Sequence, residues 1–269
     1  MIDDVGDITA YYNSALESEH SRLERHQLEY DLTWRYLNRY LPSQGSILEV
    51  GAATGRYTLE LAKRGYTLTA VDLSVALIGG CRKNIANEGL EKKVRFVVAD
   101  ARDLNGVVEK EFDAVLLMGP LYHLIVEADR KVALKEAYDR LREGGIIFSS
   151  FISRFGIMGD LLKGLPSWIE NQAEVRSILE QGKDPDDYLR GGFRGYFAQT
   201  SEITPLHEAI GFETLTVAGV EPAISADDES YNKLQGKQRQ LWLDLFYEIS
   251  AESSIIGASR HLLYVGKKK

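Results

Sequence analysis

Residues 47–57 read ILEVGAATGRY, and this stretch decides the fold. A short apolar run is followed by a series of small residues, Gly51, Ala52, Ala53 and Gly55. Glycine destabilises regular structure unless a tight turn or a close approach requires it. Where a strand leads through such a turn into a helix, the unpaired N–H groups of the helix start attract an anionic ligand group. The stretch therefore predicts a ligand-binding turn, with a plain tight turn as the alternative.

The spacing of the glycines indicates which ligand the turn suits. The nicotinamide fingerprint G-x-G-x-x-G requires glycines at positions 53 and 56 if Gly51 is the first. The sequence has Ala53 and Arg56 there. A nicotinamide-dependent oxidoreductase is therefore disfavoured, and a nucleoside ligand without a pyrophosphate fits the spacing better.

Composition restricts the class of protein. The chain has 269 residues, of which 44% are hydrophobic and 27% charged, as in ordinary globular proteins. Its net charge of −8 disfavours a nucleic-acid partner, because an acidic surface repels phosphate groups. Its one cysteine, Cys81, cannot form an internal disulfide, and the first ten residues lack the layout of a secretion signal. We expect a cytoplasmic monomer or homodimer with no membrane partner and no metal.

Short β-rich runs alternate with helical stretches from Ser46 onward, which indicates a doubly wound α/β fold with a mostly parallel sheet. Apolar and aromatic residues recur at helical spacing over residues 14–41, so a helix is expected there. Four segments follow: an N-terminal helical cap at 1–44, an α/β core at 45–153, a lid insertion at 154–199, and the rest of the core at 200–269 with a helical excursion at 221–259. We expect the lid to roof the site, because ligands of such sheets sit beyond the carboxyl ends of the strands.

Acidic residues end the next two strands of the predicted sheet. Asp72 follows TLTAV at the position where a carboxylate meets a ribose, with a helix cap in competition with Ser74 as the alternative. Asp100 ends VRFVVA beside Ala101, and it is expected to read an adenine amino group, with an ordinary turn as the alternative. Because parallel strands end at one edge, these residues and the small-residue turn are expected to form one site.

Five segments in order resemble the class I S-adenosylmethionine-dependent methyltransferases: LEVGAATG, AVDLS, VADARDL, FDAVLLMGPLYHL and LREGGIIFSSF. GPLYHL followed by FISRFG is similar to a bacterial subgroup of that family. The resemblance implies a seven-stranded Rossmann-like sheet with an antiparallel last strand, S-adenosyl-L-methionine as cofactor and S-adenosyl-L-homocysteine as product. The family pattern is E-x-G-x-G-x-G, so Ala53 is a departure from it.

The resemblance also implies a role for each residue near the cofactor. Glu49 and Gly51 would flank the methionyl part, Asp72 would hold the ribose hydroxyls, and Leu73 would stack on the adenine. The full set of implied cofactor contacts is Glu49, Gly51, Ala52, Ala53, Gly55, Asp72, Leu73, Asp100, Ala101, Met118 and Gly119, of which the last two would line the sulfonium.

The segment MGPLYHL bears on the acceptor and on the chemistry. It lacks the amide of the N-P-P-Y motif that amino methyltransferases of DNA and protein carry, which favours a small-molecule acceptor and leaves oxygen, nitrogen and sulfur open. His123 is the candidate base, with Tyr122 as its neighbour. The alternatives are a histidine bonded to the backbone and a tyrosine packed in the core.

Other side chains are candidates for substrate contact. Tyr11 and Tyr12 precede the expected helix and are placed to fold over the cofactor, with a plain surface pair as the alternative. Arg22 and Arg154 would suit an anionic substrate, and Tyr196 ends the lid. An enzyme of another reaction type that uses the same cofactor, by aminopropyl transfer or cyclisation, remains open. So does a non-catalytic nucleoside-binding module.

Overall fold

A single mixed sheet forms the centre of the computed structural model, which describes residues 4–14, 26–183, 194–221 and 228–269. The strand order is β3-β2-β1-β4-β5-β8-β7, and β8 runs antiparallel to both of its neighbours while the other pairs are parallel. The strands are β1 Ser46–Val50, β2 Thr67–Asp72, β3 Val94–Val98, β4 Phe112–Leu117, β5 Leu141–Ser153, β7 Phe212–Gly219 and β8 His261–Lys268. A two-residue strand, β6 Phe197–Ala198, pairs with the end of β5. The predicted seven-stranded sheet with an antiparallel last strand is confirmed, and β6 is an addition to it.

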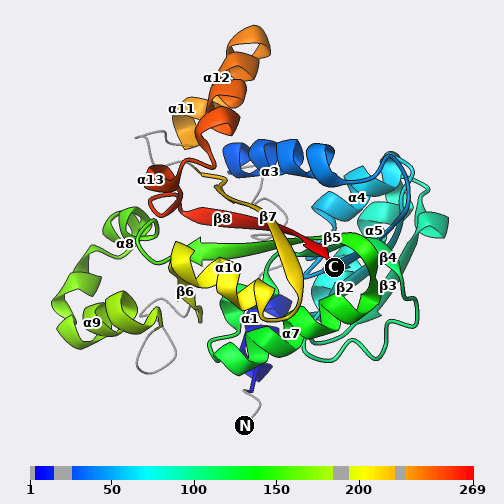
Figure 1. Ribbon diagram of the computed structural model, residues 1–269, viewed down its shortest axis with the longest axis horizontal. Coiled ribbons are helices and arrows are strands. Elements are labelled where there is room, and N and C mark those ends of the chain that lie inside the picture. The colour runs from blue at the N-terminus through cyan, green and yellow to red at the C-terminus, as the bar shows by residue number, and fades with distance from the viewer. Residues whose placement is uncertain (1–3, 15–25, 184–193, 222–227) are drawn as a thin grey trace.

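Helices cover both faces of this sheet, as the near-continuous apolar strands require. On one face lie α3 Gln27–Tyr40, α4 Arg56–Lys63 and α5 Val75–Asn87 (Figure 1). On the other lie α7 Glu127–Arg140 and α10 Thr200–Glu208. Ile47 and Leu48, adjacent in β1, are both fully buried in the two different cores. Alternating side chains of the same strand thus pack against the helices on the two faces of the sheet.

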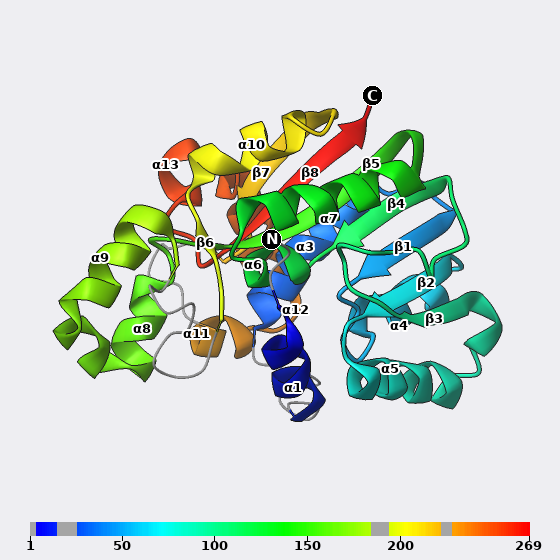
Figure 2. The same cartoon turned by 90° about the horizontal axis from the view of Figure 1, so that it is seen from below.

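The N-terminal segment differs from the single helix expected over residues 14–41. Its described parts are α1 Gly6–Ser14 and α3, and residues 15–25 lie outside the described part of the chain. Tyr11 and Tyr12 therefore belong to a helix instead of preceding one. The Asn13 side chain at the end of α1 accepts a hydrogen bond from Ser74 Oγ at 2.6 Å, and α1 packs against α5 (Figure 2).

The described parts of both insertions are helical, as predicted. The first contains α8 Met158–Gly164, the short helix η2 Pro166–Glu170 and α9 Gln172–Gln181, and it lies at the opposite end of the molecule from α4 and α5 (Figure 2). The second contains α11 Asp228–Asn232, α12 Gly236–Ile249 and α13 Ser253–Ile256, with α11 and α12 against α3. The remaining short helices are η1 Glu91–Lys93 and α6 Pro120–His123. Within the described ranges, no helix combines the length and apolar character needed to cross a membrane.

Candidate active site

The small-residue turn after β1 is locked between β2 and α6. The N–H groups of Gly51 and Ala52 both donate to the carbonyl oxygen of Val71, at 2.8 and 2.9 Å. Gly51 has a φ of +84°, and a Cβ there would lie 2.7 Å from Cδ of Pro120. Only glycine therefore suits this position, because a side chain would be strained and would collide with α6.

Ala53 adopts the left-handed conformation in which the family pattern places a glycine. Its φ is +48°, which costs an L-residue roughly 1 kcal/mol. In return, its N–H donates to Oδ2 of Asp72 at 2.9 Å, and Ser74 N–H donates to Oδ1 at 2.9 Å. Burial raises the pKa of Asp72, although the N–H groups of Ser74, Ala53 and Leu73 act in the opposite direction. The carboxylate is thus fixed at the tip of β2 by the turn itself.

Gly55 has a different role from the one that the resemblance implied. It also has a positive φ, +84°, but a Cβ there would lie 2.4 Å from Sγ of Cys81 in α5. It is not among the residues that line the pocket. Gly55 therefore permits α4 to start close against α5, and we correct its cofactor contact to a packing role.

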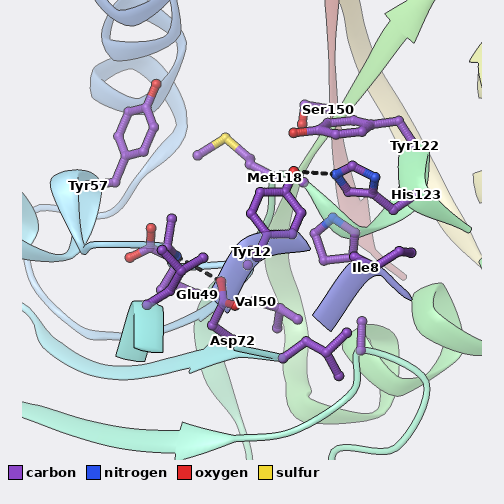
Figure 3. Close-up of a pocket in the computed structure, with 18 of the residues that line it drawn as sticks. Ile8, Tyr12, Glu49, Val50, Tyr57, Asp72, Met118, Tyr122, His123 and Ser150 are labelled. Carbon is purple, nitrogen blue, oxygen red and sulfur yellow. Dashed lines mark hydrogen bonds between the residues drawn. The ribbon is translucent and has the colours of Figure 1, made fainter. Parts of the chain in front are cut away.

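A pocket opens at the carboxyl ends of β1, β2 and β4, where the expected site lies (Figure 3). The residues from the sequence prediction that line it are Tyr12, Glu49, Gly51, Ala52, Ala53, Asp72, Leu73, Asp100, Ala101, Met118, Gly119, Tyr122 and His123. Of the described residues, none from the lid insertion 154–199 lines it; Val5, Ile8 and Tyr12 of the α1 region do. The segment around α1 therefore borders the pocket, and the described part of the insertion after β5 does not; the predicted roof stays a prediction for residues 184–193, which lie outside the described part of the chain.

Glu49 lies at the base of the pocket with its carboxyl group buried. Burial raises its pKa to about 8, against the hydrogen bond that it accepts from Thr58 Oγ1 at 2.6 Å. The carboxyl group is therefore mostly protonated at pH 7. A cationic ligand group placed beside it would favour the ionised form, because opposite charges stabilise each other strongly where water is excluded.

Asp100 lines the pocket, but its carboxylate is already engaged. Arg102 donates to it from Nε at 3.0 and 3.1 Å and from Nη2 at 2.6 Å, and its Nη1 also pairs with Asp129 at 2.7 Å. This fork-shaped contact uses lone pairs that an adenine amino group would need. The structure therefore supports Asp100 as a wall of the pocket more than as a hydrogen-bond partner for the base.

His123, at the end of α6, is held through both ring nitrogens. Nδ1 lies 2.9 Å from the carbonyl oxygen of Arg194, and Nε2 lies 2.6 Å from the hydroxyl of Tyr12 (Figure 3). The carbonyl can only accept, so we assign the proton to Nδ1, and Nε2 accepts from Tyr12. Burial lowers the pKa of His123 to about 4, although the Arg194 carbonyl and Asp7 favour its charged form. It is a weak proton acceptor, which argues against its predicted role as base.

Tyr122, its predicted neighbour, remains close to the open part of the pocket. Its ring lies 4.8 Å from that of His123, and its side chain extends toward Ser150 of β5 (Figure 3). Its hydroxyl oxygen lies 3.7 Å from the point where a Cβ on Gly119 would be. Tyr122 is therefore placed to contact a ligand that reaches beyond Met118.

The other predicted substrate contacts lie elsewhere. Arg154 is 2% exposed, and it donates to the carbonyl of Phe197 at 3.0 Å and to Glu202 at 2.9 Å. Tyr196 donates to Glu202 and packs its ring under Arg130 at 3.6 Å. Both side chains join β5, β6 and α10 and do not line the pocket, so we correct them to structural roles.

Two more candidates remain from the N-terminal region. Tyr11 is 48% exposed and packs edge-on against Tyr12, with ring centroids 5.1 Å apart. It does not line the pocket, so only Tyr12 of the pair keeps the predicted placement. Arg22 falls outside the described residues.

One end of the pocket, which we call the far end, consists of residues that the sequence did not indicate. Its walls there are Glu29 and Thr33 of α3, Ser150 of β5, Val220 after β7, and His261 and Leu263 of β8. One signal was available, because β8 was expected to be antiparallel. The first residue of an antiparallel strand lies at the edge where its parallel neighbours end, which is where His261 is found. Glu29 had no such signal, since only the packing of α3 brings it to the sheet.

Arg56, at the start of α4, is the one arginine among the described residues that line the pocket. Its guanidinium lies 4.5 Å from the ring centroid of Tyr30. It was noted in the sequence only as a departure from the nicotinamide fingerprint. It directly follows the small-residue turn in the chain, and its guanidinium packs on α3, the helix that also carries Glu29.

Two groups of side chains beyond the pocket's far end have metal-ligand chemistry. They are His26, Glu221 and Asp228, and Glu29, Glu221 and His261, with ligand atoms within 4.8 Å of one another in each group. Arg260 donates to both carboxylate oxygens of Glu221 and, at 3.1 Å, to Asp228. A guanidinium already supplies the positive charge that these carboxylates attract, so we assign no metal ligands here.

Comparison with known proteins agrees with this geometry. A family model described as a methyltransferase domain matches residues 47–145, which contain the turn and the first strand tips. The tRNA 5-carboxymethoxyuridine methyltransferase of Escherichia coli K12 is 25% identical over 138 residues, 49% of this chain. The chain spans about half the length of that relative, 51%.

A second relative is matched over more of its length, and solved structures share the fold. The carboxy-S-adenosyl-L-methionine synthase of Aliivibrio salmonicida is 30% identical over 181 residues, which cover 61% of this chain and 73% of the relative. The 1,6-didemethyltoxoflavin-N1-methyltransferase of Burkholderia thailandensis, solved with S-adenosylhomocysteine bound, superimposes with a TM-score of 0.59 at 15% identity, covering 98% of this chain and 88% of that one. The chain therefore belongs to the class I S-adenosylmethionine-dependent methyltransferase family, whose cofactor is S-adenosylmethionine.

Proposed function

We propose that this protein transfers a methyl group from S-adenosylmethionine to a small-molecule acceptor. The observation that carries the proposal is the carboxylate of Asp72, fixed by Ala53 and Ser74 at the strand tip that faces the pocket. When bound, S-adenosylmethionine supplies an electrophilic methyl group on a sulfonium. A carboxylate in this position accepts hydrogen bonds from ribose hydroxyls without moving, which favours binding because little ordering remains to be done.

The remaining walls fit the other parts of the same cofactor. Leu73 and Ala101 offer apolar surface on which a flat base can lie. Glu49 and Arg56 present a carboxyl group and a guanidinium at the turn, and these suit the ammonium and carboxylate of a methionyl group. Met118 lies between this end and the far end that contains Ser150 (Figure 3), and Gly119 follows it in the pocket lining.

The proposal of a small acceptor rests on the shape and charge of the far end. It lies between α3 and the β7–β8 edge, and the α1 residues Ile8 and Tyr12 border the pocket beside it. The net charge of −8 opposes a nucleic-acid substrate, although one relative is named for a tRNA. Membership of the narrower bacterial group with the GPLYHL motif is part of this proposal.

A second candidate keeps the cofactor and changes the reaction. It is favoured by the relative named carboxy-S-adenosyl-L-methionine synthase, of which the chain covers 73%. Such an enzyme would release a modified cofactor, whereas methyl transfer releases S-adenosylhomocysteine. Mass spectrometry of the nucleoside product distinguishes the two, and the same measurement identifies aminopropyl transfer or cyclisation.

The binding half of the proposal is tested by Asp72→Ala. We expect the affinity for S-adenosylhomocysteine to fall more than tenfold, or about 1.4 kcal/mol, because the ribose loses a charged acceptor. Isothermal titration calorimetry measures it, with Asp139→Ala on the exposed face of α7 as the matched control. Unchanged affinity in Asp72→Ala would contradict our placement of the cofactor, and no affinity in the wild-type protein would contradict the proposed function.

A further inference from the structure

The far end of the pocket contains two ionisable side chains that lie close to each other. Glu29 of α3 is 7% exposed, and the side chain of His261 is 14% exposed. Glu29 Oε2 lies 3.8 Å from His261 Nδ1, and both residues line the pocket. These are the charged groups that a ligand reaching past Met118 and Tyr122 meets.

His261 is oriented by a buried carboxylate. Its Nδ1 forms a short hydrogen bond with Glu221 Oε2. Burial works against ionisation of Glu221, yet attraction to His261 and Arg260 keeps the pKa of Glu221 well below its ordinary value. A carboxylate can only accept, so Nδ1 carries a proton in both forms of the ring: the imidazolium attracts Glu221, and in the neutral form Nε2 is the basic nitrogen. A carboxylate bonded in this way also stabilises the imidazolium that forms when the ring takes up a proton.

The region around Glu29 and His261, which we call the His261 corner, contains more negatively than positively charged groups. Arg260 Nη1 donates to Asp160 of α8 at 2.8 Å, and Arg260 Nη2 reaches His26 at 2.8 Å and Asp228 of α11 at 3.1 Å. The charged and titratable groups around His261 are thus the carboxylates of Glu29, Glu221, Asp160 and Asp228, the guanidinium of Arg260 and the imidazole of His26. Even with both imidazoles protonated, four carboxylates face three cations. Such a corner favours a cationic ligand group over an anionic one.

The two arginines that could attract an anionic acceptor, Arg56 and Arg154, have other partners. Arg56 lies beside the small-residue turn, where the proposed function assigns it to the methionyl carboxylate. Arg154, which the sequence offered as a contact for an anionic acceptor, is committed to Phe197 and Glu202. Among the described residues that line the far end, the charged and titratable groups are therefore Glu29 and His261.

We propose that Glu29 and His261 form the acceptor subsite, with Glu221 orienting the imidazole, that the acceptor is an amine, and that His261 takes up its proton. This inference rests on the proposed function. Glu29 attracts the amine as its ammonium, and His261 Nε2 removes a proton to expose the nitrogen lone pair. The amine nitrogen then forms a bond to the methyl carbon, the carbon–sulfur bond breaks, and its electron pair remains on the sulfur. The proton stays on the imidazolium, where Glu221 balances the charge until solvent accepts it.

Matched probe molecules test the subsite directly. The full chain is saturated with S-adenosylhomocysteine, and its thermal unfolding is followed with 2-phenylethylamine, 2-phenylethanol or phenylacetate at equal concentration. A second set is butylamine, butanol and butyrate. We expect at least one amine to raise the unfolding midpoint, and its alcohol and carboxylate counterparts to raise it less. A larger rise with a carboxylate or an alcohol, or no rise with either amine, would overturn the inference.

Variants show whether the response belongs to this corner. Glu29→Gln is expected to lose most of the shift caused by the amine, whereas Glu60→Gln on α4, which does not line the pocket, keeps it. His261→Gln provides a second variant if Glu29→Gln is poorly folded, and it too should reduce the shift. An unchanged shift in a folded Glu29→Gln or His261→Gln protein would refute the assignment. A shift with Zn²⁺ or Mn²⁺ that depends on Glu29, in place of one with the amines, would show a metal site and overturn it as well.

The same experiment separates this inference from the proposed function. Saturation with S-adenosylhomocysteine is itself measured by the rise that it causes in the unfolding midpoint. If the nucleoside causes no rise, the proposed function fails. If the nucleoside stabilises the chain and the amines do not, the proposed function stands and only the amine subsite is refuted.

Discussion

Two histidines, His123 and His261, line the same pocket, and different groups surround their imidazole rings. His123 donates from Nδ1 to a backbone carbonyl and lies among apolar groups and tyrosines, so burial lowers its pKa to about 4. His261 donates from Nδ1 to the carboxylate of Glu221 and has a second carboxylate, Glu29, 3.8 Å away. A neutral carbonyl offers an imidazolium far less stabilisation than a carboxylate does. Burial therefore keeps His123 neutral, whereas two carboxylates lie beside Nδ1 of His261 and favour its charged form.

The two corners also differ in what they connect. His123 joins α6 to Tyr12 of α1 and to Arg194, which itself pairs with Asp7 of α1 at 2.9 Å. These contacts hold α1 at the border of the pocket. His261 belongs to a network that joins β8 to α3, α8 and α11 around the far end. The first corner is suited to closing the pocket, and the second to binding and deprotonating an acceptor.

The largest expected effect is a loss of turnover when His261 is replaced. His261→Asn should lower kcat about a hundredfold to ten-thousandfold, which is the usual contribution of a general base. Its affinity for S-adenosylhomocysteine should stay within about twofold, because the residue lies at the other end of the pocket. Formation of S-adenosylhomocysteine with a saturating amine, measured against pH, checks this, since the loss of rate toward acidic pH that depends on His261 should disappear. Wild-type turnover in His261→Asn would transfer the role of base to another group.

Most of the cofactor part of this site could be predicted from the sequence, because it is built from local signals. Gly51, Ala53 and Asp72 lie within about 20 positions of one another, and each stands at the end of a recognisable strand. Parallel strands end at one edge, so the approximate meeting place of these residues follows from the order of strands alone. The antiparallel last strand was expected on a different ground, the resemblance to the methyltransferase family.

The far end could not be predicted, because it is assembled from segments that are remote in the sequence. Glu29 and Glu221 are separated by almost the whole chain and meet only through the packing of α3 and the start of β8. The wrong placements of Arg154 and Tyr196 have a related cause. Their positions beside strand ends were predicted correctly. The residue that engages both of them, Glu202 of α10, meets them only through the packing of the folded chain, which the sequence does not show.

A smaller effect concerns stability in acid. The pKa of His123 is lowered to about 4 from 6.5, so between these values the unfolded chain binds more protons than the folded one. Stability should therefore fall as the pH decreases from 6.5 toward 4, by up to roughly 3 kcal/mol for this residue. His123→Gln should remove that part of the fall, as measured by urea unfolding at pH 7 and pH 4.5. His207, whose pKa burial lowers to about 3, contributes in the same direction and remains in both proteins. An identical pH dependence in the variant would show that His123 is not the buried neutral ring described here.

The smallest effect tests whether the His123 corner closes the pocket. Tyr12→Phe removes the hydroxyl that donates to His123 Nε2 at 2.6 Å and leaves the ring in place. A hydrogen bond of this kind contributes about 1 kcal/mol, so the affinity for S-adenosylhomocysteine should fall about fivefold while kcat at saturation changes little. Tyr11→Phe, on the exposed side of the same helix, is the matched control. A large loss of kcat in Tyr12→Phe with normal affinity would give the Tyr12–His123 pair a part in proton transfer, and the contrast between the two histidines would then no longer hold.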